Sequence, residues 1–197
     1  SDVMNQKWKP RAKSETECVS LTAHCLKYTK ELEAKGKFQL TIWPEHCLVG
    51  SKGHAVVKEI NDSLQEWTKQ TQRTVHYIQK AQNRLTEMYS GIEAEVVMED
   101  DELTRTNKEL LGRLKIADQL IICGQAKSHC VNFTTRDIVK HWHKENERIC
   151  VLNDACSNVP FCDKAGDLFI SDMQKEGVSI RTTEDVFQLY LGDDKEK

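Results

Sequence analysis

The sequence predicts an α/β fold of three layers, in which helices cover both faces of a mostly parallel sheet. Short apolar segments alternate with amphipathic helical ones along most of the 197 residues, which is typical of strand–helix–strand units. The clearest strand, 119–123, runs through a turn into a helix. No repeat or linker interrupts this pattern. One domain over 1–197, with an irregular lead-in at 1–13 and a charged tail at 192–197, is therefore the simplest organisation.

Two helices and two strands are expected in the first 80 residues. Ser14 and Glu17 have the spacing of a capping box, and apolar residues then recur at gaps of three and four up to Gly36, which predicts a helix. Three further elements follow in the order strand, helix and strand, over 38–43, 56–67 and 74–79. Pro44 ends the first of these strands.

The remaining residues continue the alternation after a long acidic loop over 81–102, whose length is typical of functional or mobile loops. Helices are expected over 103–114, 130–142, 163–175 and 184–191. Strands are expected over 119–123, 149–153 and 178–181. The sequence thus predicts five strands in all.

Composition limits the classes of function. The net charge of −3 gives no electrostatic reason to expect a nucleic-acid partner. No apolar run approaches the roughly 20 residues that a membrane span needs, so a membrane is not an expected partner either. Eight cysteines without a C-x-x-C pair predict free thiols in a reducing, intracellular compartment. They do not favour a disulfide framework or a structural zinc site.

Cys130 is the candidate nucleophile. A parallel sheet places its chemistry at the carboxyl ends of its strands, and this cysteine follows such an end at the start of a helix. The first N–H groups and the dipole of that helix favour the thiolate. The alternative is a small core side chain, because cysteine is among the most buried residue types.

The residues around Cys130 strengthen the catalytic interpretation. The pattern G-x-A-x-S-x-C-V over 124–131, followed by Thr134, resembles the nucleophile turn of the isochorismatase-like cysteine hydrolases. This superfamily includes nicotinamidases and N-carbamoyl-amide hydrolases. Other segments resemble further motifs of the family, in family order, at 42–54, 151–157 and 177–180.

The resemblance implies a catalytic arrangement. Cys130 would attack the carbonyl carbon of an amide, and Lys80 would stabilise charge beside it. The backbone N–H groups of Ala126 and Cys130 would hold the oxyanion, with a cis peptide bond between Gln125 and Ala126. The expected reaction is hydrolysis of the C–N bond of a small neutral amide through a thioacyl-enzyme.

The substrate pocket is expected to include Trp43, His46, Asn83, Glu87 and Phe133. Core packing of the aromatic residues and loop capping by the polar ones are the alternatives. His46 matches a histidine that, in nicotinamidases, completes a metal site with an Asp-x-His pair, and this sequence has no such pair. We therefore expect no cofactor and a hydrogen-bonding role for His46. A divalent metal beside His46 stays open as an alternative.

The general base of the family has no counterpart here. By resemblance it is an aspartate at the end of a first, central strand, and this sequence begins after that point. We expect residues upstream of Ser1, another chain in a homo-oligomer or complex, or a rearranged segment to fill the gap. Two hypotheses stay open: an amidase-type cysteine hydrolase, or a catalytically degenerate relative that serves as a structural or interaction subunit.

Overall fold

A computed structural model describes residues 12–36 and 38–191. The chain divides into two compact units, a first unit that ends at Gln79 and a second unit that begins at Lys80. Most of the predicted lead-in and all of the predicted charged tail lie outside the described residues. That the chain forms one domain stays a prediction. Every helix in the described ranges is too short or too polar to span a lipid bilayer.

Two helices make up most of the regular structure of the first unit. α1 (Glu15–Ala34) begins where the capping box predicted, because the Ser14 hydroxyl accepts the Glu17 N–H at 3.2 Å. α2 (Lys58–Thr71) follows a 3₁₀ turn, η1 (Lys52–His54). Both helices predicted for this unit are confirmed.

The two strands predicted for the first unit are wrong. Residues 38–43 and 74–79 are irregular, and neither segment pairs with another strand among the described residues. Their side chains are largely exposed, with Ile42 at 84% and Tyr77 at 68%. The backbone groups of a strand are satisfied by a neighbouring strand, so an apolar pattern alone does not form one. Three strands are therefore described, where the sequence predicted five.

The second unit carries a three-stranded parallel sheet. Its strands, in spatial order, are β1 (Leu120–Gln125), β2 (Ile149–Ser157) and β3 (Ser179–Arg181). These are the three strands predicted for this part of the chain. The first four residues of β2 are all buried, which is typical of a central strand covered on both faces.

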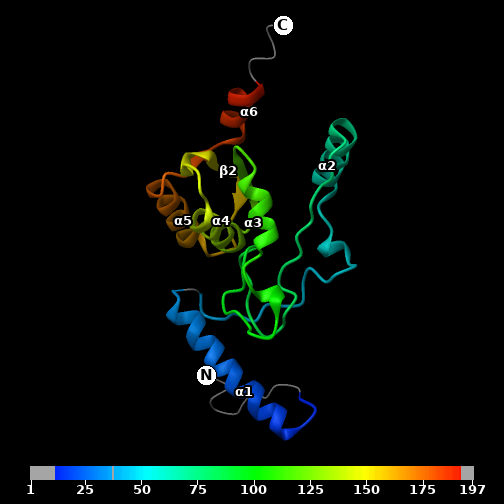
Figure 1. The fold of residues 1–197 in the computed structure, drawn as a ribbon, viewed down its shortest axis with the longest axis vertical. Coiled ribbons are helices and arrows are strands. Elements are labelled where there is room, and N and C mark those ends of the chain that lie inside the picture. The colour runs from blue at the N-terminus through cyan, green and yellow to red at the C-terminus, as the bar shows by residue number, and fades with distance from the viewer. Residues whose placement is uncertain (1–11, 37, 192–197) are drawn as a thin grey trace. The chain divides into compact units, whose positions relative to one another are not determined.

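Helices flank this sheet and alternate with its strands along the chain. They are α3 (Lys108–Lys115), α4 (Asn132–His141), α5 (Asp163–Lys175) and α6 (Thr183–Leu191), with the short turns η2 (Glu102–Thr104), η3 (Lys127–Val131) and η4 (Asn146–Arg148). Figure 1 shows α3, α4 and α5 gathered around β2. One hydrophobic core joins them and includes Leu111 of α3, Ile138 of α4, Val151 of β2 and Phe169 of α5. The predicted α/β fold is confirmed.

Two helices of the second unit differ from their predicted ranges at the N-terminal end. The helix predicted over 103–114 divides into η2 and α3, because the Asn107 side chain caps a new helix by accepting the Leu110 N–H at 2.9 Å. The helix predicted over 130–142 opens as the π turn η3 and continues as α4.

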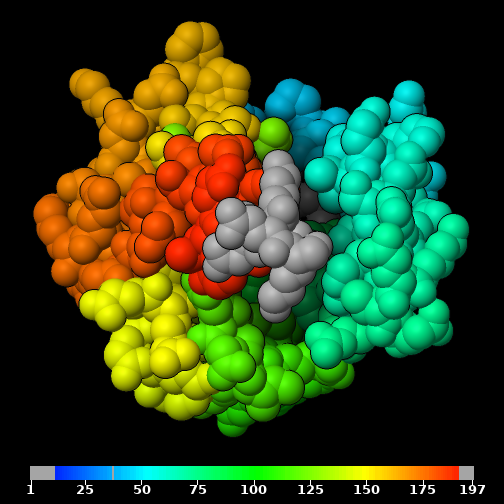
Figure 2. Space-filling model, turned by 90° about the horizontal axis from the view of Figure 1, so that it is seen from above, coloured from blue at the N-terminus to red at the C-terminus, as the bar shows by residue number. Residues whose placement is uncertain are grey.

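Hydrogen bonds at two places hold α6 against the sheet. Asp154 of β2 accepts the N–H of Thr183 at 2.9 Å and its hydroxyl at 2.6 Å, and these bonds lower the pKa of that carboxyl. The Tyr190 hydroxyl donates to Gln119, the residue before β1. Figure 2 looks onto this helix, which is drawn in red.

Candidate functional site

Cys130 lies in the turn that joins the end of β1 to α4. The peptide bond between Gln125 and Ala126 is cis, as the resemblance implied. The Ala126 carbonyl accepts the N–H groups of His129 and Val131, both at 3.0 Å, and this shared acceptor closes η3 as a π turn. Cys130 is half-buried in the turn, while His129 and Val131 are buried.

Ser128 and His129 form a buried pair directly before Cys130. Ser128 is 0% exposed, and its hydroxyl oxygen lies 2.8 Å from Nδ1 of His129. The same oxygen accepts the Val159 N–H at 3.0 Å, from the segment between β2 and α5. Sequence analysis did not find this pair. The signal available was a serine and a histidine in succession before the candidate nucleophile.

Lys80 is held by the loop that follows it. Its Nζ donates to the Met88 carbonyl at 2.7 Å. Met88 is buried, and the next residue, Tyr89, stacks on Phe133 of α4 with ring centroids 5.3 Å apart. A continuous series of contacts therefore connects Lys80 to the helix that follows Cys130.

Asn83 and Glu87 use their side chains within the same loop. Asn83 donates to Asp101 at 2.7 Å and accepts the Leu85 N–H at 2.8 Å. Glu87 accepts the N–H of Met88 at 3.2 Å. These bonds are those of the loop-capping alternative. Contact of either residue with a substrate stays a prediction.

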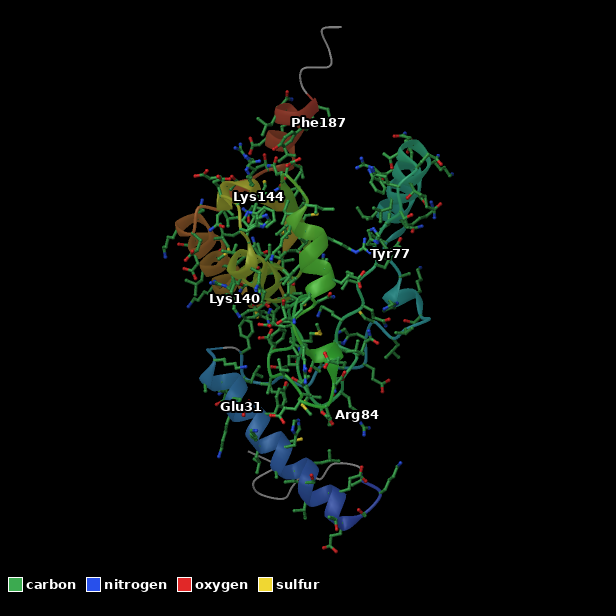
Figure 3. All side chains as sticks on the ribbon, viewed as in Figure 1. Glu31, Tyr77, Arg84, Lys140, Lys144 and Phe187 are labelled. Carbon is green, nitrogen blue, oxygen red and sulfur yellow. The ribbon has the colours of Figure 1, made fainter. Side chains whose placement is uncertain are left out.

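A hydrogen bond and an ion pair connect the acidic loop to α4 at two further places. The Gly91 N–H donates to the Thr134 hydroxyl at 2.9 Å. Glu93 lies 3.4 Å from the ammonium group of Lys140, which Figure 3 labels. Burial raises the pKa of Glu93, but the Thr106 hydroxyl at 2.6 Å and the charge of Lys140 outweigh burial and lower the pKa overall. The loop is thus held against the helix that begins after Cys130.

Trp43 and His46, the other two pocket candidates, belong to the first unit. Trp43 is 46% exposed, and His46 is exposed as well. Nδ1 of His46 lies 2.6 Å from the Pro44 carbonyl oxygen. This is a local contact within an irregular segment, and a role of either residue in the pocket stays a prediction.

The chain is similar to nicotinamidases in sequence and in structure. No protein-family model matches the sequence. The nicotinamidase of Escherichia coli (strain K12) is 26% identical over 145 residues, which are 74% of this chain and 60% of the relative. The yeast nicotinamidase Pnc1p bound to the inhibitor nicotinaldehyde is 18% identical, with a TM-score of 0.55, and the match covers 73% of this chain and 60% of that one. The chain therefore shares the fold of the isochorismatase-like superfamily and resembles nicotinamidases in sequence.

A further solved structure has the same fold. PnC1 from L. infantum in complex with nicotinate is 23% identical, with a TM-score of 0.53, and the match covers 80% of this chain and 67% of that one. The chain spans about 60% of the length of the E. coli and yeast nicotinamidases. The likeness to solved structures establishes the isochorismatase-like fold.

The prediction that no cofactor takes part is wrong, because a similar protein was solved with a metal. That protein is the pyrazinamidase of Pyrococcus horikoshii in complex with zinc, 19% identical with a TM-score of 0.47, and the match covers 83% of this chain and 86% of that one. Over residues 12–36 and 38–191, no three His, Cys, Asp or Glu side chains are grouped so as to hold a metal ion. The described residues therefore do not fit a metal by themselves, and we derive no step through one.

None of the eight cysteines, which all lie in the described ranges, forms a disulfide, and they differ in burial. Cys150 in β2 is fully buried, and burial raises the pKa of its thiol. Cys156 and Cys25 are half-buried, and burial raises the pKa of both thiols. Because the thiolate is the nucleophile, these three cysteines suit packing better than catalysis.

Proposed function

We propose that this protein is a cysteine amidase of the nicotinamidase type, with Cys130 as the nucleophile. The observation that carries the proposal is the position of Cys130. It lies in the turn after the carboxyl end of β1 and directly before α4, in a chain related to a nicotinamidase. Open parallel sheets carry their ligand and catalytic groups at this edge.

The proposed reaction consists of two displacements at the acyl carbon. First, the Cys130 Sγ thiolate attacks the amide carbonyl carbon, the C–N bond breaks, and the leaving nitrogen takes a proton and departs as ammonia or an amine. Then water attacks the thioester carbon, the C–S bond breaks, and the carboxylic acid and the thiol are released. Each step forms an oxyanion, for which we assign the N–H groups of Ala126 and Cys130 as donors.

Lys80 is assigned to stabilise negative charge beside the sulfur. Its ammonium group donates to the Met88 carbonyl at 2.7 Å. An ammonium group carries three donors, so this bond orients the group without exhausting it. The carboxylate that accepts the thiol proton in the family has no matching motif in this sequence, and we assign no described residue to that role.

The proposed substrate is a small, flat and neutral amide such as nicotinamide. The stacked rings of Tyr89 and Phe133, inclined by 28° to each other, are apolar side chains joined to the helix after Cys130. Glu87 and the acidic loop make an anionic substrate less favourable. Asn83 stays in the proposed pocket, as predicted from the sequence, and contact of Trp43 or His46 with the substrate stays a prediction.

The test measures ammonia release from nicotinamide by the natural protein and two cysteine variants. Cys130→Ala removes the nucleophile, so we expect kcat/KM to fall by about 10³-fold or more. The matched control is Cys18→Ala in α1, a half-buried cysteine of the first unit. It is expected to change kcat/KM by less than about twofold.

Two results would contradict the proposal. Amide hydrolysis that survives in Cys130→Ala at the natural rate would exclude this residue as the nucleophile. A natural protein that hydrolyses neither nicotinamide nor other small amides would favour the alternative, a structural or interaction subunit without catalytic activity.

A further inference from the structure

We infer that Ser128 is a positioning residue for Cys130 that acts through the side chain of His129, a role that rests on the proposed function of Cys130. Ser128 is fully buried and lies two residues before the candidate nucleophile. Its hydroxyl oxygen contacts Nδ1 of His129 at 2.8 Å and the Val159 N–H at 3.0 Å. A buried hydroxyl with a partner on each side has a fixed orientation.

The protons of this contact can be assigned. The Val159 N–H donates to one lone pair of the Ser128 oxygen, which leaves the hydroxyl proton available to Nδ1 of His129, and we assign it there. Nδ1 is therefore the acceptor, and the ring proton of the neutral imidazole is on Nε2. Burial lowers the pKa of His129, which agrees with a neutral ring.

Aromatic packing holds the His129 ring from another side. The ring meets Tyr89 edge-on, with centroids 5.6 Å apart and planes at 70°. The hydrogen bond and this packing together fix the side chain of His129. The peptide unit between His129 and Cys130 carries the N–H that we assign to the oxyanion. An ordered His129 therefore holds one of the two proposed donors in place.

The same turn is held from the other side of Cys130. Asn132 donates to the Ser128 carbonyl at 3.3 Å and accepts Nε of Arg136 at 2.7 Å. Arg136 pairs with Asp172 of α5 at 2.8 Å. Ser128 takes part in both attachments, through its carbonyl and through its hydroxyl. Removing the hydroxyl alone keeps the Asn132 attachment and releases His129 and the Val159 N–H.

The test compares Ser128→Ala with Ser90→Ala, a closely matched control. Ser90 is also fully buried, and its hydroxyl also accepts a backbone N–H, that of Ile92 at 3.0 Å. Three quantities are measured for each variant of the natural protein: kcat and KM for nicotinamide, the melting temperature, and the rate at which iodoacetamide alkylates Cys130, followed by peptide mass spectrometry.

For Ser128→Ala we expect kcat to fall about tenfold or more while KM changes less than about twofold. Alkylation of Cys130 should slow about threefold or more, because a loosened turn aligns its N–H groups less well with the thiolate. Ser90→Ala should lower the melting temperature and change the alkylation rate by less than about twofold. Equal slowing of alkylation in both variants would show a general loss of stability and would overturn the inference.

A second variant keeps the inference testable if Ser128→Ala does not fold. His129→Phe keeps an aromatic ring beside Tyr89 and removes Nδ1, so it should slow alkylation of Cys130 by a similar factor. Adding Ser128→Ala to His129→Phe should then change the rate by less than about twofold. An unchanged rate in His129→Phe, or an undiminished effect of Ser128→Ala in that background, would overturn the inference. Alkylation needs no substrate, so absence of amide turnover contradicts the proposed function and leaves this test valid.

Discussion

The two units of the chain differ in what supports their secondary structure. In the second unit, strand and helix residues share one core, in which Ile149, Val151 and Phe169 are fully buried. In the first unit, α2 has no buried residue, and the segments predicted as strands are irregular. A helix satisfies its backbone internally, whereas a strand depends on its neighbour. Apolar patterns therefore predicted helices correctly in both units, but strands only where other strands pair with them.

The largest expected effect is a difference in amide hydrogen-exchange rate between the second unit and the first. Amides of β2 over 149–152 lie in a buried ladder between two strands, while 38–43 and 74–79 have no ladder among the described residues. We expect amides in the centre of β2 to exchange about a thousandfold more slowly than those of the two irregular segments. Mass spectrometry of peptic fragments of the natural protein measures this.

If the amides of 38–43 or 74–79 were protected from exchange as strongly as those of β2, the difference between the two units would be contradicted. Such protection would mean that these segments are paired strands in the natural protein, as the sequence predicted. Rapid exchange in both segments, together with slow exchange in β2, would leave the three-stranded description intact.

Matched substitutions of isoleucine give the next largest effect. Ile149 is 0% exposed at the start of β2, and Ile42 is 84% exposed in the first unit. Ile149→Ala should lower the free energy of unfolding by about 2–5 kcal/mol, through lost burial and a residual cavity. Ile42→Ala should change it by less than about 0.5 kcal/mol. Urea unfolding of both variants measures the difference, and equal losses would show that Ile42 is buried in the natural protein.

The sequence predicted much of the second unit because its signals are local and agree with the packing. The helix predicted over 163–175 is α5, residue for residue. The start of the next helix upstream was not predictable in the same way. The π turn before α4 depends on one carbonyl, that of Ala126, which accepts two N–H groups, and no periodicity of side chains reports such a bond.

The polar contacts of the candidate site were the least predictable part. A family pattern gave positions for Cys130 and Lys80, but the partner of Lys80 is a backbone carbonyl, that of Met88. Asn83 pairs with Asp101, eighteen residues along the loop. Contacts of this kind depend on loop conformation, which sequence spacing does not determine. Side-chain roles therefore need measurement even where the fold is secure.

The smallest expected effect is on the pH dependence of stability, to which a buried histidine and an exposed one should contribute differently. Burial lowers the pKa of His129 in the folded protein below the ordinary value of about 6.5 that holds in the unfolded chain. Between these two pKa values the unfolded chain binds a proton that the folded protein does not, so the free energy of unfolding falls as pH drops below about 6.5. The contribution of His129 is fully present above that pH, where both states are neutral.

Thermal melts of wild type and His129→Phe at pH 7.5 and pH 5.5 measure this contribution. The variant should lose less stability on acidification than wild type, whereas His54→Phe, at an exposed position of the first unit, should lose as much as wild type. An identical loss in His129→Phe and wild type would mean that the ring takes a proton as readily in the folded state as in the unfolded chain, and that burial does not lower its pKa.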